Sequence, residues 1–354
     1  MKVVYCWSDL SGYMAACWRE LAGRTGVDVH ILAHGSTGHG SFHSGLLEGL
    51  SHRLLTETER GDGLLVETLV AEQRPDIVVM TGWWVAPYRN LVHSPRLARA
   101  KFIMGVDSPW RHEAQFLNRV RYGRTLRKFD HFFVTGERSW QYVTRLGVPP
   151  ARISRGMYGV DVTGWNHVAS RRTAGSWPRQ FVFLGRYDWV KAIDVLVAGY
   201  QAYRNMVSDP WPLVCCGSGP EKPRLTNAEG ILDKGFVQPG DLPGVLAESG
   251  AFVLPSRFDP WPLALVEAAA AGLPVICTDA CGSAVEVVRP FYNGLVIPKD
   301  SPAALAEAFA AVHARVALLA EWGQRSIELA RPYATQFWAD RWVTAFQRLM
   351  ADHA

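Results

Sequence analysis

The chain has 354 residues, which is too many for a single ordinary core and suits two domains of ~150 to 200 residues each. Hydrophobic residues make up 48% and charged residues 20%, a balance typical of globular proteins that excludes a disordered or fibrous chain. The formal net charge of +4 is too small to indicate a nucleic-acid partner, and we expect none.

Cysteine spacing and hydropathy indicate a cytoplasmic protein. No CxxC pair occurs, and most of the cysteines fall in or beside predicted strands, so we expect reduced core residues and neither disulfides nor a zinc site. The N-terminal residues lead directly into a strand pattern, and no run of about 18 apolar residues occurs, so neither a secretion signal nor a spanning helix is expected. The cysteines are Cys6, Cys17, Cys215, Cys216, Cys277 and Cys281.

The first elements predict a Rossmann-like domain without a dinucleotide fingerprint. A strand at residues 3–6 is followed by a turn at Ser11 and Gly12, an amphipathic helix, and a second strand at 27–33. The absence of G-x-G-x-x-G after the first strand argues against NAD binding. The next loop contains three histidines and several glycines. It favours a mobile acceptor-side loop over a metal site, because it supplies no Asp, Glu or Cys. The histidines are His34, His39 and His43.

Two further strands of this half end in polar or aromatic turns. They are predicted at residues 76–80 and 102–106, and ligands of open α/β sheets gather beyond such carboxyl ends. Gly82, Trp83, Trp84 and residues 107–110 are therefore expected to face a ligand. Asp107 has a second interpretation, since Asp107 or Ser108 would also cap a helix through Phe116. Most of the chain's tryptophans are expected to pack in cores, although aromatic side chains also line sugar sites.

A basic segment follows at residues 111–128. A solvated helix face is the simpler interpretation. The alternative is attraction to a charged acceptor or to an anionic membrane surface, which would make the protein peripheral on the inner face of the membrane. The basic residues are Arg111, Arg119, Arg121, Arg124, Arg127 and Lys128.

The second half begins after a polar linker predicted at residues 162–178. A buried strand at 181–184 leads through Gly185 into a turn that carries Arg186 and Lys191. Two positive charges there would neutralise a diphosphate, Lys as a point charge and Arg as a fork. Both side chains are expected to project from the surface.

Residues 251–279 predict a strand, a helix and a second, parallel strand. Asp259 lies in the loop before the helix, and Glu267 lies within it. In the simpler interpretation Asp259 caps the helix and Glu267 lies on its solvent stripe. In the other, the free amide groups of Leu263 and Ala264 bind an anion, and the two carboxylates hold hydroxyl groups attached to that anion. A nucleotide sugar fits this second description.

These motifs resemble those of one family. DPWPLALVE is similar to the E-x7-E signature of the GT-B glycosyltransferases of family GT4, also called group 1, and GRYDWVK matches their G-R-x4-K pattern. The GSGPE and GVD segments agree as well, so the resemblance covers nearly all of the second domain and the first only loosely. The chain departs from the family at Asp259, where Glu is usual, and at Ala192 and Pro262, where Gly is usual.

The resemblance implies a GT-B fold, an α/β architecture of two Rossmann-like domains whose parallel sheets face a central cleft. Residues 1–162 would form the acceptor-side domain and 163–335 the nucleotide-sugar-binding domain. The terminal helix, residues 336–354, would pack back on the first domain.

The implied activity is that of a retaining, metal-independent glycosyltransferase that needs no cofactor and uses a UDP or GDP sugar as donor. The acceptor would be the hydroxyl of a sugar, a lipid-linked or a small molecule, in glycan, glycolipid or polysaccharide biosynthesis. A nucleotide-sugar epimerase and a binding protein with a decayed site remain alternatives. The implied catalytic residues are Arg186, Lys191, Asp259 and, where the family often has His, Asp107. The implied donor-binding residues are Glu267, Leu263, Ala264, Gly185, Phe236, Val237 and Gly12.

Overall fold

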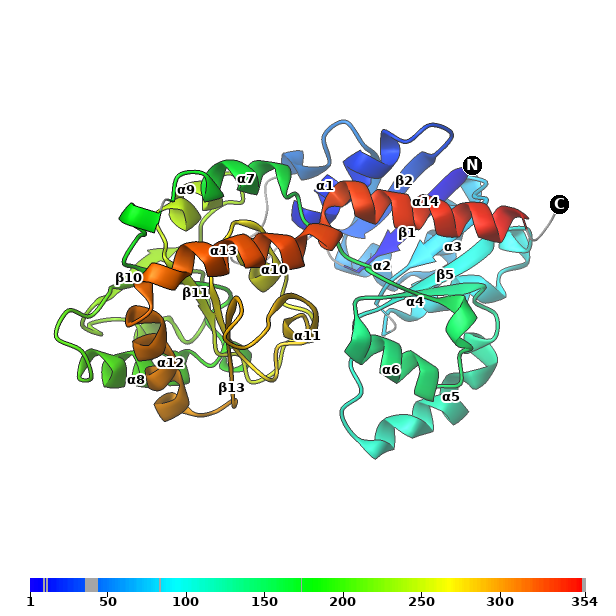
Figure 1. Ribbon diagram of the computed structural model, residues 1–354. Coiled ribbons are helices and arrows are strands. Elements are labelled where there is room, and N and C mark those ends of the chain that lie inside the picture. Colours follow the sequence, from blue (N-terminus) through cyan, green and yellow to red (C-terminus); the bar gives the residue numbers. More distant parts are fainter. Residues whose placement is uncertain (9, 11, 36–43, 83, 173, 352–354) are drawn as a thin grey trace. The chain divides into compact units, whose positions relative to one another are not determined.

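The computed structural model describes the chain except for residues 9, 11, 36–43, 83, 173 and 352–354 (Figure 1). The chain divides into two compact units. Unit 1 consists of Met1–Val160 together with Tyr333–Ala354, and unit 2 of Asp161–Pro332. Each unit is built around one parallel sheet, so the predicted pair of Rossmann-like folds is confirmed.

Unit 1 contains a seven-stranded sheet in the order β3-β2-β1-β4-β5-β6-β7, in which every described pair is parallel. The order reverses between β1 and β4. Two of these strands, β3 and β7, were not predicted, and β3 begins with exposed polar residues in place of an apolar run. The strands are β1 Lys2–Trp7, β2 Asp28–His34, β3 Ser51–Leu55, β4 Ile77–Met80, β5 Lys101–Val106, β6 His131–Val134 and β7 Ile153–Arg155.

The helices of unit 1 connect these strands and include the end of the chain. The expected cap at Asp107 or Ser108 is wrong, because the helical segment after β5 begins at Glu113 with His112 in the N-cap position. The α-helices are α1 Gly12–Ala22, α2 Glu57–Gly61, α3 Gly63–Glu72, α4 Ala86–Asn90, α5 Leu117–Leu126, α6 Glu137–Arg145 and α14 Thr335–Ala351. The 3₁₀ turns are η1 Ser44–Leu47, η2 Leu91–His93, η3 Pro95–Leu97, η4 Glu113–Phe116 and η5 Pro150–Arg152, and a further turn, η9 Arg331–Tyr333, begins in unit 2 and ends at the first residue of the returning unit 1 segment.

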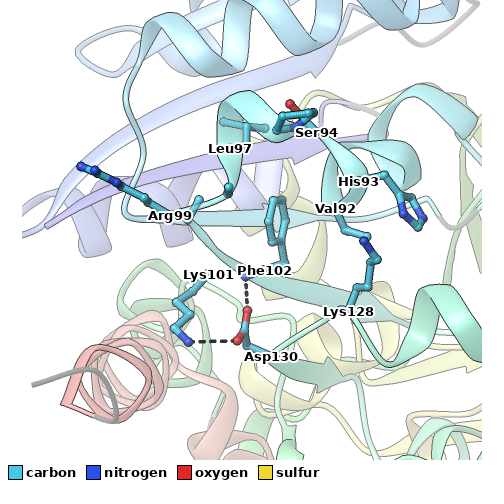
Figure 2. Close-up of a pocket in the computed structure, with 12 residues that line it drawn as sticks. Val92, His93, Ser94, Leu97, Arg99, Lys101, Phe102, Lys128 and Asp130 are labelled. Atoms are coloured by element: carbon cyan, nitrogen blue, oxygen red, sulfur yellow. Dashed lines mark hydrogen bonds and ion pairs between the residues drawn. The ribbon is translucent and has the colours of Figure 1, made fainter.

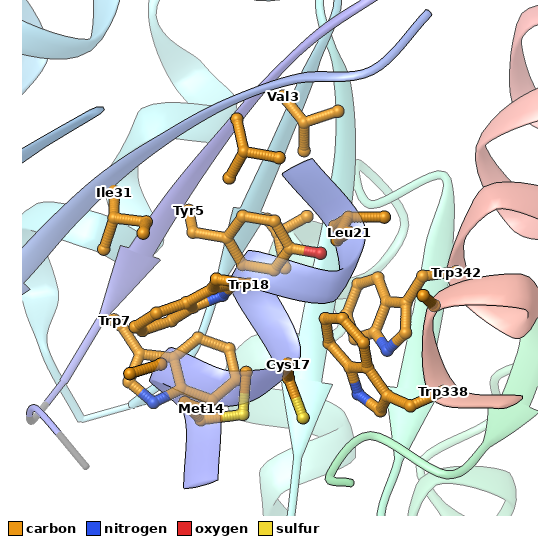
Figure 3. Close-up of a cluster of buried hydrophobic side chains, with 14 of the residues drawn as sticks. Val3, Tyr5, Trp7, Met14, Cys17, Trp18, Leu21, Ile31, Trp338 and Trp342 are labelled. Atoms are coloured by element: carbon orange, nitrogen blue, oxygen red, sulfur yellow. The ribbon is translucent and has the colours of Figure 1, made fainter. Parts of the chain in front are cut away.

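The aromatic core of unit 1 joins α14 to α1 and the sheet (Figure 3). Trp18, Trp338 and Trp342 are fully buried, and the ring of Trp342 stacks on Phe133 with centroids 3.8 Å apart. The Trp338 indole donates a hydrogen bond to the Met157 carbonyl at 2.7 Å. Aromatic rings bury large apolar areas, so this cluster holds the terminal helix in unit 1.

Unit 2 contains a six-stranded sheet in the order β10-β9-β8-β11-β12-β13, again with parallel pairs. The order reverses between β8 and β11, whose bounds coincide with the predicted strands at 181–184 and 251–254. The strands are β8 Phe181–Leu184, β9 Leu213–Cys216, β10 Ile231–Gly235, β11 Ala251–Leu254, β12 Val275–Thr278 and β13 Gly294–Ile297.

The helices of unit 2 correct the predicted linker. Residues 162–178 contain α7, whose Trp165 and Val168 are buried, so most of this segment is part of the folded unit. The α-helices are α7 Thr163–Ala169, α8 Ile193–Arg204, α9 Leu242–Ala247, α10 Leu263–Ala270, α11 Ala284–Val287, α12 Pro302–His313 and α13 Val316–Ala330. The 3₁₀ turns are η6 Ala174–Ser176, η7 Trp189–Lys191 and η8 Lys222–Arg224.

Across the described part of the chain, no single helix is long and apolar enough to cross a membrane. The segments Pro302–His313 and Val316–Tyr333 meet the requirements of length and composition only as a pair, and they are bent by 102°.

Candidate active site

The candidate site lies at the reversal point of the unit 2 sheet. Strands β8 and β11 are neighbours there, although they are far apart in sequence. The loops after their carboxyl ends carry the predicted cations and the first predicted carboxylate. Because α/β sheets bind ligands at this edge and at this reversal of strand order, the topology places these groups where a ligand is expected.

The turn after β8 is shaped by Asp188. Its carboxylate caps η7 by accepting a hydrogen bond from the Lys191 amide at 3.0 Å, and it lies 3.1 Å from the Arg186 guanidinium. The Arg186 side chain is 75% exposed, as predicted. Ala192 follows with a φ of +57°, which explains why glycine would suit this position, since a Cβ disfavours the left-handed region.

Lys191 does not project from the surface as expected. Its ammonium group forms an ion pair with the Asp259 carboxylate, and the two side chains are only 15% and 11% exposed. Asp259 does not cap the following helix, so that simpler interpretation is wrong: Pro262 occupies the N-cap position of α10 and supplies no side-chain hydrogen bond. The structure thus unites two of the four predicted catalytic residues in one largely buried pair.

Arg257, which was not predicted, holds the two loops together. Its guanidinium makes a bidentate contact with Asp194 at 2.8 and 2.7 Å and donates to Asp300 at 2.5 Å and to the Trp189 carbonyl at 2.9 Å. Its own amide donates to the Val190 carbonyl at 2.8 Å. The hydrogen bond from Arg257 lowers the pKa of Asp194. This residue therefore ties the Asp259 loop to the turn that carries Lys191.

The loop after β12 supports Asp259 from the other side. The Gly282 amide donates to the Asp259 carbonyl at 2.8 Å, and the Asp259 amide donates to the Ala280 carbonyl at 3.3 Å. A Cβ at Gly282 would lie 1.7 Å from the Pro260 carbonyl oxygen, so only glycine permits this approach. The backbone at Asp259 is fixed by both contacts.

Glu267 lies on the less buried stripe of α10, together with Leu263 and Ala264. Within the described residues, no group donates a hydrogen bond to its carboxylate. Burial raises the pKa of this carboxyl to about 7, so it is poorly solvated despite its partial exposure. Such an acceptor, one turn beyond the first amide groups of α10 at Leu263 and Ala264, suits a ligand that brings hydroxyl groups.

The remaining predicted donor residues of unit 2 lie along the same sheet edge. The Gly185 amide donates to the Cys216 carbonyl at 3.1 Å, and a Cβ on Gly217 would lie 1.9 Å from the Gly185 carbonyl oxygen. Phe236 and Val237 follow β10, the outer strand beside β9. The phenyl ring of Phe236 is exposed and Val237 is half-buried. The loops after β8, β9 and β10 therefore form one continuous edge.

The predicted residues of unit 1 also follow strand ends. Asp107 comes after β5, where its carboxylate accepts a hydrogen bond from the hydroxyl of the half-buried Tyr158 at 3.4 Å. Gly12 is the first residue of α1. His34 pairs with Glu57 at 3.1 Å. The predicted Ser11, His39, His43 and Trp83 lie outside the described residues.

A separate pocket of about 660 Å³ lies in unit 1, beside the start of β5 (Figure 2). Lys101 pairs with Asp130 at 3.1 Å there, and Asp130 also accepts the Phe102 amide at 2.8 Å. None of the predicted catalytic or donor-binding residues lines this pocket, and it opens at the amino ends of the strands. We therefore do not place transfer chemistry in it. Its lining is Val92, His93, Ser94, Pro95, Leu97, Ala98, Arg99, Ala100, Lys101, Phe102, Lys128 and Asp130.

The family match found by comparison with known proteins lies in unit 2. Residues 178–315 match the family described as "Glycosyl transferases group 1". The chain is 28% identical over 228 residues to a D-inositol 3-phosphate glycosyltransferase of Salinispora arenicola, covering 57% of this chain and 50% of that protein. It is 29% identical over 161 residues to an exopolysaccharide phosphotransferase of Streptomyces coelicolor, covering 43% of this chain and 17% of that protein. The chain thus spans half the length or less of these two relatives.

The fold agrees along the whole chain. The crystal structure of the Anabaena protein HepE in complex with UDP superimposes with a TM-score of 0.77 at 16% identity, covering 98% of this chain and 100% of that one. Two parallel sheets with this likeness define the class of the protein, the GT-B fold. Within unit 2, residues 178–315 are similar to the group 1 glycosyltransferases.

Proposed function

We propose that the protein transfers a sugar from a nucleotide-diphosphate sugar to a hydroxyl acceptor, with retention of configuration and without an obligatory metal. The observation that carries this proposal is the Lys191–Asp259 pair beside the exposed Arg186 at the reversal point of the unit 2 sheet. These groups bring together two cations that can pair with a diphosphate and a carboxylate that can accept a hydrogen bond from a sugar hydroxyl.

The two cations serve the leaving group. Negative charge grows on the diphosphate as the sugar bond breaks, and preorganised cations stabilise that charge more than the ground state. Lys191 is held in place by Asp259 before the donor arrives, whereas the exposed Arg186 can close over the phosphates. In this mechanism the pair takes the part that a metal ion plays in other transferases.

The carboxylates and amide groups bind the rest of the donor. Asp259 accepts a hydrogen bond from a hydroxyl of the transferred sugar, and Glu267 accepts hydrogen bonds from the ribose. The free amides of Leu263 and Ala264 bind phosphate at the start of α10. Gly185 lets the backbone approach the donor closely.

Other parts of the chain complete the proposal. Phe236 and Val237 bind the nucleobase of a UDP or GDP sugar through their backbone. In unit 1, Gly12 approaches the donor, and Asp107 acts in the place where the family often has His. The acceptor is the hydroxyl of a sugar, a lipid-linked or a small molecule, and the pathway is cytoplasmic glycan or polysaccharide synthesis.

A donor screen tests the proposal. Thermal shift with UDP, GDP, ADP and TDP sugars should identify the donor, because a ligand at 100 times its dissociation constant adds ~2.7 kcal/mol of stability. With that donor, nuclear magnetic resonance should show transfer to an acceptor with an unchanged anomeric configuration. Donor isomerisation without transfer would indicate an epimerase, and binding without any turnover would indicate a decayed site. Either result would refute the proposal.

Arg186→Ala separates catalysis from binding, because this exposed side chain can be removed without leaving a buried partner. Loss of a preorganised charge contact should lower the rate at saturating donor by roughly a hundredfold to a thousandfold. Arg171→Ala, an exposed arginine of the same unit, is the matched control. If Arg186→Ala keeps full turnover and only weakens donor binding, Arg186 is a docking residue and its catalytic role is wrong.

A further inference from the structure

Helix α5 and the turn before it carry a charge pattern that the proposed transfer reaction does not use. Residues 111–128 contain six basic residues and one acidic residue, Glu113. In the part of the chain that the structure describes, the ion pairs involve none of the five cations from Arg119 to Lys128. The guanidinium of Arg119 lies 5.6 Å from the ring centroid of Phe116, and that of Arg121 lies 5.2 Å from the ring centroid of Tyr122. Neither contact neutralises its charge.

One face of α5 packs on unit 1. Asn118, Tyr122 and Leu126 follow one another at intervals of four, so they lie on the same side of the helix. Leu126 is buried, and the Asn118 amide donates to the Tyr142 hydroxyl at 3.0 Å. The helix is thus held by this inner stripe, and substitutions on the opposite side need not disturb the fold.

The opposite face combines cations with exposed apolar side chains. Leu117 is 67% and Val120 is 81% exposed, and with 3.6 residues per turn they share a face with Arg124 and Arg127. Phe116, one residue before the helix, is also exposed. Large apolar side chains grouped on a surface mark an interaction site more often than isolated ones do.

We propose that this face of α5 docks the protein on an anionic membrane surface. Nucleic-acid phosphates would use the arginines but would leave Leu117 and Val120 in water, whereas a lipid surface accepts both kinds of side chain. Anionic headgroups attract the cations, and the apolar side chains enter the boundary between headgroups and acyl chains. Lys128, just after the end of α5, also lines the pocket in Figure 2.

Sedimentation of the full chain with lipid vesicles tests this proposal without donor or acceptor, so its outcome is independent of the transferase assay. Binding is expected to vesicles of phosphatidylcholine with phosphatidylglycerol, to weaken as salt rises, and to be far weaker with phosphatidylcholine alone. Arg124→Glu with Arg127→Glu should lower the partition coefficient by at least roughly 30-fold, since each lost cation costs about fivefold. Leu117→Ser with Val120→Ser should lower it by about tenfold or more.

Matched controls make the vesicle experiment specific. Leu64→Ser removes another exposed apolar side chain of unit 1, 72% exposed, and should leave binding unchanged. Arg171→Glu with Arg331→Glu applies the same charge change on exposed positions of unit 2. It should lower the logarithm of the partition coefficient by less than half as much as the charge variant of α5. Equal binding to both vesicle types would overturn the proposal. Full vesicle binding by the Leu117→Ser, Val120→Ser variant would also overturn it. If that variant then bound a short DNA duplex tightly, the ligand of this face would be nucleic acid.

Discussion

Replacing Glu267 by Gln should make the free protein more stable above neutral pH. The carboxyl has a pKa of about 7 in the folded chain against an ordinary value of 4.5, so the fold favours its neutral form. Between these two values the folded state holds more protons than the unfolded state, and the free energy of unfolding therefore falls as pH rises. The separation of the two pKa values corresponds to a loss of about 3 kcal/mol above pH 7.

The same substitution should weaken nucleotide binding. A charge-assisted hydrogen bond contributes ~1.5 to 3 kcal/mol, and the amide of Gln replaces the charged acceptor proposed for the ribose. Because the ribose hydroxyls favour the ionised carboxylate, wild-type affinity should also fall below pH 7, as protonation of Glu267 competes with binding. The Gln variant lacks this component of the pH dependence.

Two measurements made on the same samples check both effects. Denaturation midpoints of the wild type and of the Glu267→Gln variant should agree near pH 4.5 and separate up to about pH 8. Calorimetry with the nucleoside diphosphate should give lower affinity for the variant at about pH 8. Glu307→Gln, on an exposed position of α12, is the control and should show neither effect. Parallel stability profiles for wild type and variant would refute the argument from burial, and equal affinities would refute the ribose role.

Two further predictions concern the loops around the charge pair. Asp259→Asn should lower the transfer rate by at least about tenfold and spare nucleoside-diphosphate affinity, and an equal loss of both in kinetics and calorimetry would contradict a sugar contact. Arg257→Gln should lower the free energy of unfolding by ~1 to 3 kcal/mol, because Asp194 and Asp300 lose a hydrogen-bonded cation. Arg257→Lys should restore part of that stability but little turnover, because Lys cannot make the bidentate contact. Denaturation and rate measurements test this. Recovery of both stability and turnover would argue against a positioning role for Arg257.

The sequence predicts a strand most clearly where both faces of the strand are buried. Strands β8 and β11 are buried along their whole length, so their apolar runs have clear bounds. Strand β3 lies at the edge of its sheet and begins with exposed polar residues, so it carries no such signal. Helix α7 was not predicted for a related reason: the residues that follow it are polar, and its buried face is marked by Trp165 and Val168 among the residues whose burial is described.

The sequence identifies individual residues of the candidate site but not the contacts between them. The sequence identifies Lys191 and Asp259 separately, yet they are 68 positions apart and meet only because β8 and β11 are neighbours in the sheet. Arg257 was not among the residues predicted from the sequence. Its partners Asp194 and Asp300 are distant in sequence, so no local pattern indicates its contacts.

The side chain of Asp259 is one methylene shorter than the Glu that is usual at this position in the family, and the surrounding contacts explain how it still reaches Lys191. Its backbone is drawn toward the Lys191 turn by Arg257 and is held from the other side by Gly282, so a side chain one methylene shorter still reaches the ammonium group. Of the hydrogen bonds that the structure describes for this carboxylate, the one from Lys191 ends on Oδ2. Since a carboxylate has about four acceptor positions, Oδ1 retains capacity for a sugar hydroxyl. The ion pair therefore leaves Asp259 an acceptor position for the sugar hydroxyl proposed above, and the loop contacts hold its backbone beside the Lys191 turn.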